Sequence, residues 1–167
     1  LTLLDALQPT GLTRLVLDWA SIWPQLGALA QIMPLAAAEI LERDSFRELG
    51  TLVAPIGEAR EGERALSLRI IREDGSVTEA DVPSGTIQRF PLGLNEQVTL
   101  EVRPNRAFDI GLGRKGMGGK TVVRGGSLGI VVDTRGRPLS LPQDPKRCRA
   151  KLQEWLRNLI HDADSPA

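Results

Sequence analysis

Few residues in this chain of 167 are suited to catalysis. One histidine, His161, and one cysteine, Cys148, are present. Catalysis by Ser/His or Cys/His pairs requires a histidine held by fixed neighbours, and zinc sites require several thiolates or imidazoles. His161 lies in a polar tail, so we assign it no role. Cys148 lies four residues before Leu152 on an apolar helical stripe, and we expect it to be a buried small hydrophobe, although the arginines on either side of it would favour a thiolate.

Two aspartates lie where functional acids often occur. Asp18 and Asp133 each follow an apolar segment typical of a strand. Strand-end aspartates are equally common as turn or capping residues, and the other groups of a catalytic site are lacking. We therefore expect no catalytic residues in this chain and no enzymatic activity from it.

A glycine-rich segment contains two motifs that resemble nucleotide-binding loops. Residues 111–116 match G-x-G-x-x-G, but that motif must be followed by a helix, and Thr121 to Val123 have the residues of a strand. Gly119-Lys120-Thr121 resembles the end of a phosphate-binding loop, but the first glycine would have to occupy position 114, which is Arg114. We therefore expect a flexible glycine loop with no bound cofactor or metal.

The basic residues are concentrated in one part of the chain. Residues 111–151 contain 10 basic and 2 acidic residues, although the whole chain has 21 of each. Nucleic-acid sites usually add stacking aromatics, and this segment contains none. A basic surface that matches an acidic surface of the parent protein or of a partner is the preferred interpretation, and an anion or nucleic-acid site is the alternative. The candidate contact residues are Arg114, Lys115, Lys120, Arg124, Arg135 and Arg137.

The first 57 residues have the pattern helix, strand, helix, helix, strand. A helix over residues 1–8 precedes a strand over 12–18, a helix capped by Ser21, a second helix over 34–43 and a strand over 49–56. This order predicts the C-terminal part of an α/β lobe rather than a complete domain. Apolar surface left exposed on such a part would favour a homodimer.

Residues 58–142 have a different, β-rich pattern. Short apolar segments are separated by glycine and proline turns, which predicts a small antiparallel β-barrel or sandwich. Residues 143–167 predict an amphipathic helix with Asp144 as its cap and Pro145 at its first position, and then a tail. The fold class is therefore α+β. The expected strands of the middle region are 66–70, 77–82, 86–90, 97–103, 121–124, 128–133 and 139–141.

No apolar run reaches the roughly 18 residues that span a bilayer, and no charged-then-apolar signal peptide is present. We therefore expect a cytoplasmic protein that does not bind membranes.

Three stretches resemble a known family. They are residues 3–18, which include Leu-Leu-Asp-Ala-Leu-Gln-Pro-Thr-Gly, residues 49–57, and Gly125 to Leu139 with the following Leu141-Pro142. They resemble the C-terminal part of the glutamate mutase L-like (MutL-type) accessory proteins, which are related to sugar kinases, actin and heat-shock chaperones. The resemblance implies an accessory, chaperone-like role for cobalamin-dependent mutases.

The same resemblance implies that the ATP-binding motifs lie upstream of this chain, in lobes of its parent protein. No ATPase residue is carried over, because no position of this sequence matches such a motif. The hypothesis is therefore a non-catalytic fragment whose β-rich module contacts the upstream lobes or a mutase subunit.

Overall fold

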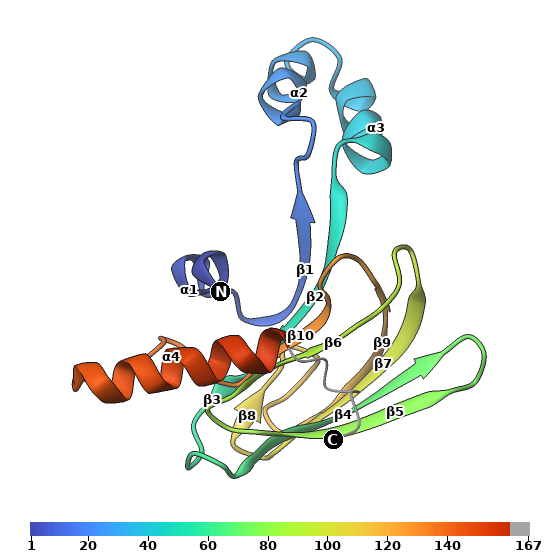
Figure 1. Ribbon diagram of the computed structural model, residues 1–167. Coiled ribbons are helices and arrows are strands. Elements are labelled where there is room, and N and C mark those ends of the chain that lie inside the picture. The colour runs from blue at the N-terminus through green and yellow to red at the C-terminus, as the bar shows by residue number, and fades with distance from the viewer. Residues whose placement is uncertain (161–167) are drawn as a thin grey trace.

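Most strands of the chain lie in two four-stranded sheets, as the computed structural model, which describes residues 1–160, shows (Figure 1). The first sheet has the order β1 (Gly11–Leu17), β2 (Arg47–Ala54), β10 (Gly129–Asp133), β6 (Ile87–Phe90). The second has the order β5 (Val77–Pro83), β4 (Arg64–Arg72), β7 (Gln97–Pro104), β9 (Gly119–Arg124). A third, two-stranded sheet pairs β3 (Ile56–Gly57) with β8 (Phe108–Asp109).

Four helices accompany these strands within residues 1–160. They are α1 (Thr2–Leu7), α2 (Trp23–Ala30), α3 (Pro34–Asp44) and α4 (Pro145–Ile160). The predicted α+β class is confirmed. No closed barrel is found in this part of the chain, because each four-stranded sheet keeps two edge strands.

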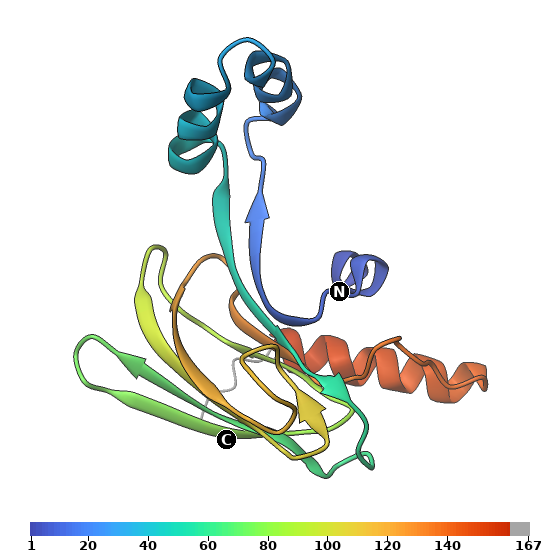
Figure 2. The ribbon, with the colours of Figure 1, turned by 180° about the vertical axis from the view of Figure 1, so that it is seen from behind.

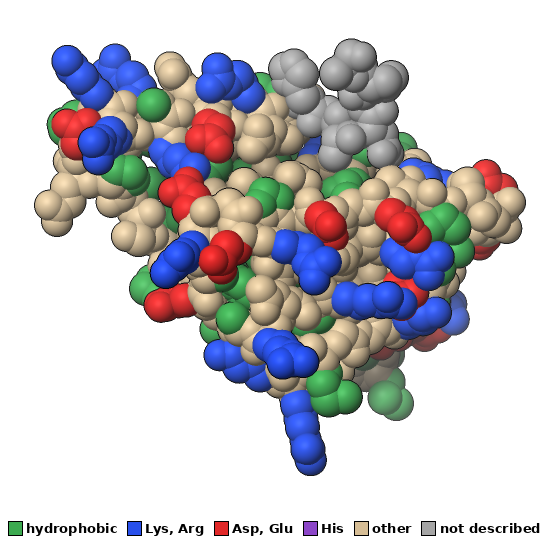
Figure 3. All heavy atoms as spheres, turned by 90° about the horizontal axis from the view of Figure 1, so that it is seen from below, with side chains coloured by type: hydrophobic (Ala, Val, Ile, Leu, Met, Phe, Trp, Pro, Cys, Tyr) green, Lys and Arg blue, Asp and Glu red, His purple; other side chains and the backbone are tan. Residues whose placement is uncertain are grey.

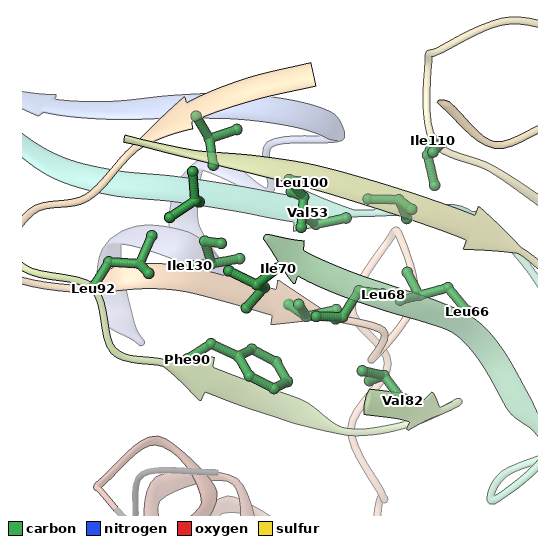
Figure 4. Packing of buried hydrophobic residues seen from close by; sticks show 14 residues of the cluster. Val53, Leu66, Leu68, Ile70, Val82, Phe90, Leu92, Leu100, Ile110 and Ile130 are labelled. Atoms are coloured by element: carbon green, nitrogen blue, oxygen red, sulfur yellow. The ribbon is translucent and has the colours of Figure 1, made fainter. Parts of the chain in front are cut away.

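The two four-stranded sheets share one hydrophobic core (Figure 4). Alternate residues of β4 and β7 point into it, as the period-two pattern of the sequence predicts, and Phe90 and Ile130 enter it from the first sheet. The Asp74-Gly75 turn joins β4 to β5, with Asp74 accepting a hydrogen bond from the Ser76 amide at 2.8 Å.

The first sheet combines strands from both sides of the predicted boundary after residue 57. β2 pairs in parallel with β10, and β10 pairs antiparallel with β6. Gly50 lies opposite Gly129 in the parallel pair, and a Cβ on Gly50 would come within 2.0 Å of the Gly129 carbonyl oxygen. Gly50 therefore permits an approach of β2 to β10 that no larger residue would allow, and a Cβ on Gly129 would come within 2.3 Å of the Phe90 carbonyl oxygen at the end of β6.

An arm projects from the first sheet (Figures 1 and 2). We define the arm as residues 18–46, the connection between β1 and β2 that contains α2 and α3 side by side. The predicted cap of its first helix is wrong. Asp18, not Ser21, accepts the Ile22 and Trp23 amides at 3.1 Å each, because Ser21 adopts a left-handed backbone with φ of 54°.

The C-terminal helix begins as predicted and packs on the first sheet. Asp144 accepts the Arg147 amide at 2.8 Å, and Pro145 is the first residue of α4. Trp155 is the buried anchor of this helix, and its indole N–H donates to the Gly85 carbonyl at 2.9 Å. The predicted strand over 139–141 is wrong, because Leu139 ends a turn and donates its amide to the Gln8 side chain at 2.9 Å instead of to a strand.

Candidate functional site

The six basic candidate residues do not share one surface. Arg114 and Lys115 are exposed on the loop between β8 and β9, and Arg124 is exposed at the end of β9. Lys120 lies on the outer face of the second sheet, whereas Arg135 and Arg137 point inward after β10 and have side chains only 0% and 5% exposed. The concentration of positive charge in the sequence is therefore divided among separate places in the structure.

The outer face of the second sheet is charged but balanced. Glu101 lies at its centre and accepts from Arg103 at 2.6 Å, Arg69 at 3.3 Å and Lys120 at 3.4 Å. The hydrogen bond from Arg103, aided by that from Lys120, holds the pKa of Glu101 below its ordinary value, although desolvation opposes this shift. Figure 3, which views the molecule from below, shows basic and acidic side chains intermixed on this side.

A buried ionic cluster joins distant segments of the chain. Asp133, which is fully buried, accepts from Arg135 at 2.7 Å and from Arg137 at 2.7 Å. Arg135 also donates to Asp5 of α1 at 2.7 Å, and its guanidinium carbon lies 4.8 Å from the centre of the Trp155 ring. One guanidinium therefore links α1, β10 and α4.

The protonation states of the cluster follow from these contacts. Burial alone would raise the pKa of Asp133, but hydrogen bonds from Arg135 and Arg137 outweigh it and keep the pKa below its ordinary value. Burial would lower the pKa of Arg135, and the carboxylates of Asp133 and Asp5 raise it instead. Asp133 is thus a permanently ionised counter-ion at neutral pH, which is unsuited to accept a proton as a general base.

The remaining sequence candidates are ordinary structural residues. Asp18 caps α2, and residues 111–116 form a loop that β9 follows, so the helix needed by a dinucleotide motif is replaced by a strand. Cys148 is partly exposed rather than buried as expected. His161 lies outside the described residues. Among residues 1–160 no group of three or more potential ligands is arranged to hold a metal ion.

An apolar groove of about 570 Å³ lies beside α1. We call it the α1 groove; its floor is the outer face of the first sheet, and the C-terminal part of α4 contributes one wall. Arg14 and Arg89 are its charged lining residues, and Arg14 forms an ion pair with Glu48. The leucines that line the groove include Leu3, Leu4, Leu7, Leu15, Leu128 and Leu159.

Sequence reasoning missed both the ionic cluster and the α1 groove. Asp5 and Arg135 are 130 residues apart, so no local pattern joins them. A signal was present for part of the cluster, because Asp133 and Arg137 are four residues apart around a glycine turn and form an ion pair. The leucines of residues 1–7 were visible as a helix face, but nothing in the sequence indicated that Leu3 and Leu7 would remain exposed.

No protein-family model, curated protein or solved structure matches this chain. No helix within residues 1–160 has the length and apolar character needed to cross a bilayer.

Proposed function

We propose that this chain is a non-catalytic docking module of a cytoplasmic accessory protein for cobalamin-dependent mutases, and that the α1 groove receives the upstream lobes of its parent chain. The mutase relationship rests on the resemblance of residues 3–18, 49–57 and 125–142 to the glutamate mutase L-like proteins. The docking role rests on one observation, the open apolar groove beside α1.

The groove has the chemistry of a protein interface. Its lining is dominated by leucine and valine, and large exposed apolar surfaces mark places where another protein binds. The side chain of Leu7 is 76% exposed, and the helix that carries it, α1, has only six residues. Such a short helix depends on packing for its stability, so a partner that buries Leu3 and Leu7 would stabilise α1 as well as bind it.

The ionic cluster supports this role by holding α1 in place. Arg135 binds Asp5, and the Gln8 side chain accepts the Leu139 amide, so the C-terminal half of α1 is tied to the segment after β10. We propose that the two sheets, as a small sandwich, are the rigid support on which the groove is presented to the upstream lobes or to a mutase subunit.

The alternative, an anion or nucleic-acid site on residues 111–137, has less support. Arg135 and Arg137 are buried against Asp133, and Lys120 is paired with Glu101. An electrostatic site of this kind would need its cations on one accessible surface.

A pull-down tests the proposal, with the whole chain as bait in lysate from its native source. The variants are Leu7→Asp in the groove and Leu94→Asp, a matched control in the exposed turn between β6 and β7. We expect the wild-type chain and the Leu94→Asp control to retain an identified mutase subunit or the upstream lobes in high salt, and Leu7→Asp to lose them.

Two results would overturn the docking role. One is equal recovery of these proteins by Leu7→Asp and by the control. The other is a bait that retains neither protein, including the case in which only nucleic acid is recovered and is released by salt.

A further inference from the structure

The arm contains a long segment without charge. Residues 19–38 include no Asp, Glu, Lys, Arg or His, and they form α2, its connection to α3 and the first half of α3. In the described side chains of these two helices only Leu26 and Ala37 are buried. An uncharged surface helix hairpin of this kind is unusual, because surface helices normally carry a polar face.

Large apolar side chains cover the arm. The most exposed are Leu35 at 86% and Ile32 at 83%, both at or beside the α2–α3 connection, which is the part of the arm farthest from the sheets (Figure 1). Exposed apolar side chains extend from Trp19 to Leu41; they are Trp19, Trp23, Ile32, Met33, Leu35, Ile40 and Leu41.

The exposed apolar area of the arm approaches what one partner contributes to a standard interface. At roughly 150–200 Å² for each fully exposed large side chain, these residues present on the order of 600–800 Å². The largest apolar patch on a typical monomer covers about 300–600 Å², and each partner of a standard interface contributes about 800 Å².

The two helices of the arm have few buried residues. Helices of 8 and 11 residues gain most of their stability in water from tertiary packing, and α2 and α3 pack mainly on each other through Leu26 and Ala37. A second helix hairpin laid across the first would bury the remaining apolar faces in a four-helix arrangement.

We propose that the occupant of this surface is the arm of a second copy of the chain, so that two arms form a four-helix bundle and the protein is a symmetric dimer. In a two-fold interface the same surface patch of each chain faces the other. A patch that carried charge of one sign would therefore be repelled by its copy. Residues 19–38 meet this condition because they are uncharged. The acidic residues of the arm, Asp18, Glu39, Glu42 and Asp44, lie outside this segment, and Glu39 is paired with Arg43 at 3.1 Å.

The dimer leaves the α1 groove available. The groove is lined by α1, β1 and one residue of α4. Figures 1 and 2 show α1 and α4 at the base of the arm, away from the α2–α3 connection through which the proposed bundle would form. Self-association through the arm is therefore independent of the function proposed for the groove, and each is tested by different variants.

Sedimentation velocity over a wide concentration range tests the dimer. We expect the wild-type chain to approach twice 18.2 kDa, with a dissociation constant that changes little with salt because the interface lacks charge. Leu35→Asp should raise the dissociation constant at least about thirtyfold, as loss of a central interface residue does. Leu94→Asp, an equally drastic change on the sheet region, should leave it unchanged.

Hydrogen exchange locates the interface and covers the case in which a variant misfolds. Amides of residues 23–44 in the wild-type chain should become protected as concentration rises, while those of α1 should not. A wild-type chain that stays monomeric at every concentration, a Leu35→Asp chain as dimeric as the control, or protection that appears in α1 instead of the arm would each overturn the proposal.

Discussion

The two-sheet region and the arm differ in how far their apolar side chains are buried. In the two-sheet region alternate residues of β4 and β7 are buried in a shared core, and the outer face of the second sheet is covered by paired charges centred on Glu101. In the arm the charges disappear over residues 19–38, and most apolar side chains remain exposed. The core between the sheets is buried within the chain, whereas the apolar faces of the arm are exposed, as a surface that binds a partner would be.

The aspartates of the two regions show the same contrast. Asp133 is fully buried between Arg135 and Arg137, and Arg135 extends the cluster to Asp5 of α1. Asp18 lies at the base of the arm and only caps the helix that follows it. Asp133 therefore belongs to a cluster that reaches a residue 130 positions away from Arg135, whereas the contacts of Asp18 are local.

The largest expected effect is a loss of stability on truncation of a buried residue of the two-sheet region, compared with truncation of an exposed residue of the arm. Phe90→Ala should lower the free energy of unfolding by about 3–5 kcal/mol, because it leaves a cavity between the sheets. Leu35→Ala should change it by less than about 0.5 kcal/mol when measured at concentrations where the chain is monomeric. Urea denaturation measures both, and similar losses for the two variants would remove the distinction between the regions.

The next effect concerns the buried ionic cluster. Asp133→Ala should destabilise the chain by about 3 kcal/mol, because Arg135 and Arg137 would be left buried without their shared carboxylate. The loss should also release α1, which Arg135 holds through Asp5, and this is visible as faster hydrogen exchange in residues 2–7. Unchanged exchange in α1 would contradict the link between the cluster and the groove.

A smaller effect is expected at the base of the arm. Asp18→Ala removes the side-chain cap of α2 and should cost about 1 kcal/mol, confined to the arm. Hydrogen exchange in residues 22–30 should accelerate while the strands of the second sheet keep their protection. Asp18→Asn should give an intermediate result, since its single side-chain oxygen can accept only one of the two amide hydrogen bonds and preserves part of the protection.

The smallest effect is a dependence on pH. The pKa of Asp133 is lower in the folded chain than its ordinary value of 3.8, so its stabilising contribution is complete above that value. As the pH falls below 3.8, the unfolded chain takes up a proton before the folded chain does, and stability decreases by at most about 1 kcal/mol down to about pH 3.

Denaturation of wild type and Asp133→Asn between about pH 5 and pH 3 measures this contribution. The variant, which has no carboxylate at this position, should lose less stability over the interval. Parallel acid profiles would show that Asp133 does not contribute to the pH dependence.

Local patterns were sufficient to predict much of the fold. Asp144 followed by Pro145 marks the start of α4, and the alternation from Leu66 to Ile70 predicts a half-buried strand. Both features depend on residues a few positions apart, whose effect on the backbone is the same in any fold. The uncharged segment of the arm is also visible in the sequence, although its exposure is not.

Only the tertiary structure decided which charges are available at the surface and which strands are neighbours. Arg135 and Arg137 belong to a basic segment, yet they are turned inward because Asp133 and Asp5 neutralise them there. The pairing of β2 with β10 joins strands that are far apart in the sequence, and it requires a residue without a Cβ at Gly50, which lies against the Gly129 carbonyl. Contacts between residues so far apart are selected by the packing of the whole chain, which no short pattern encodes.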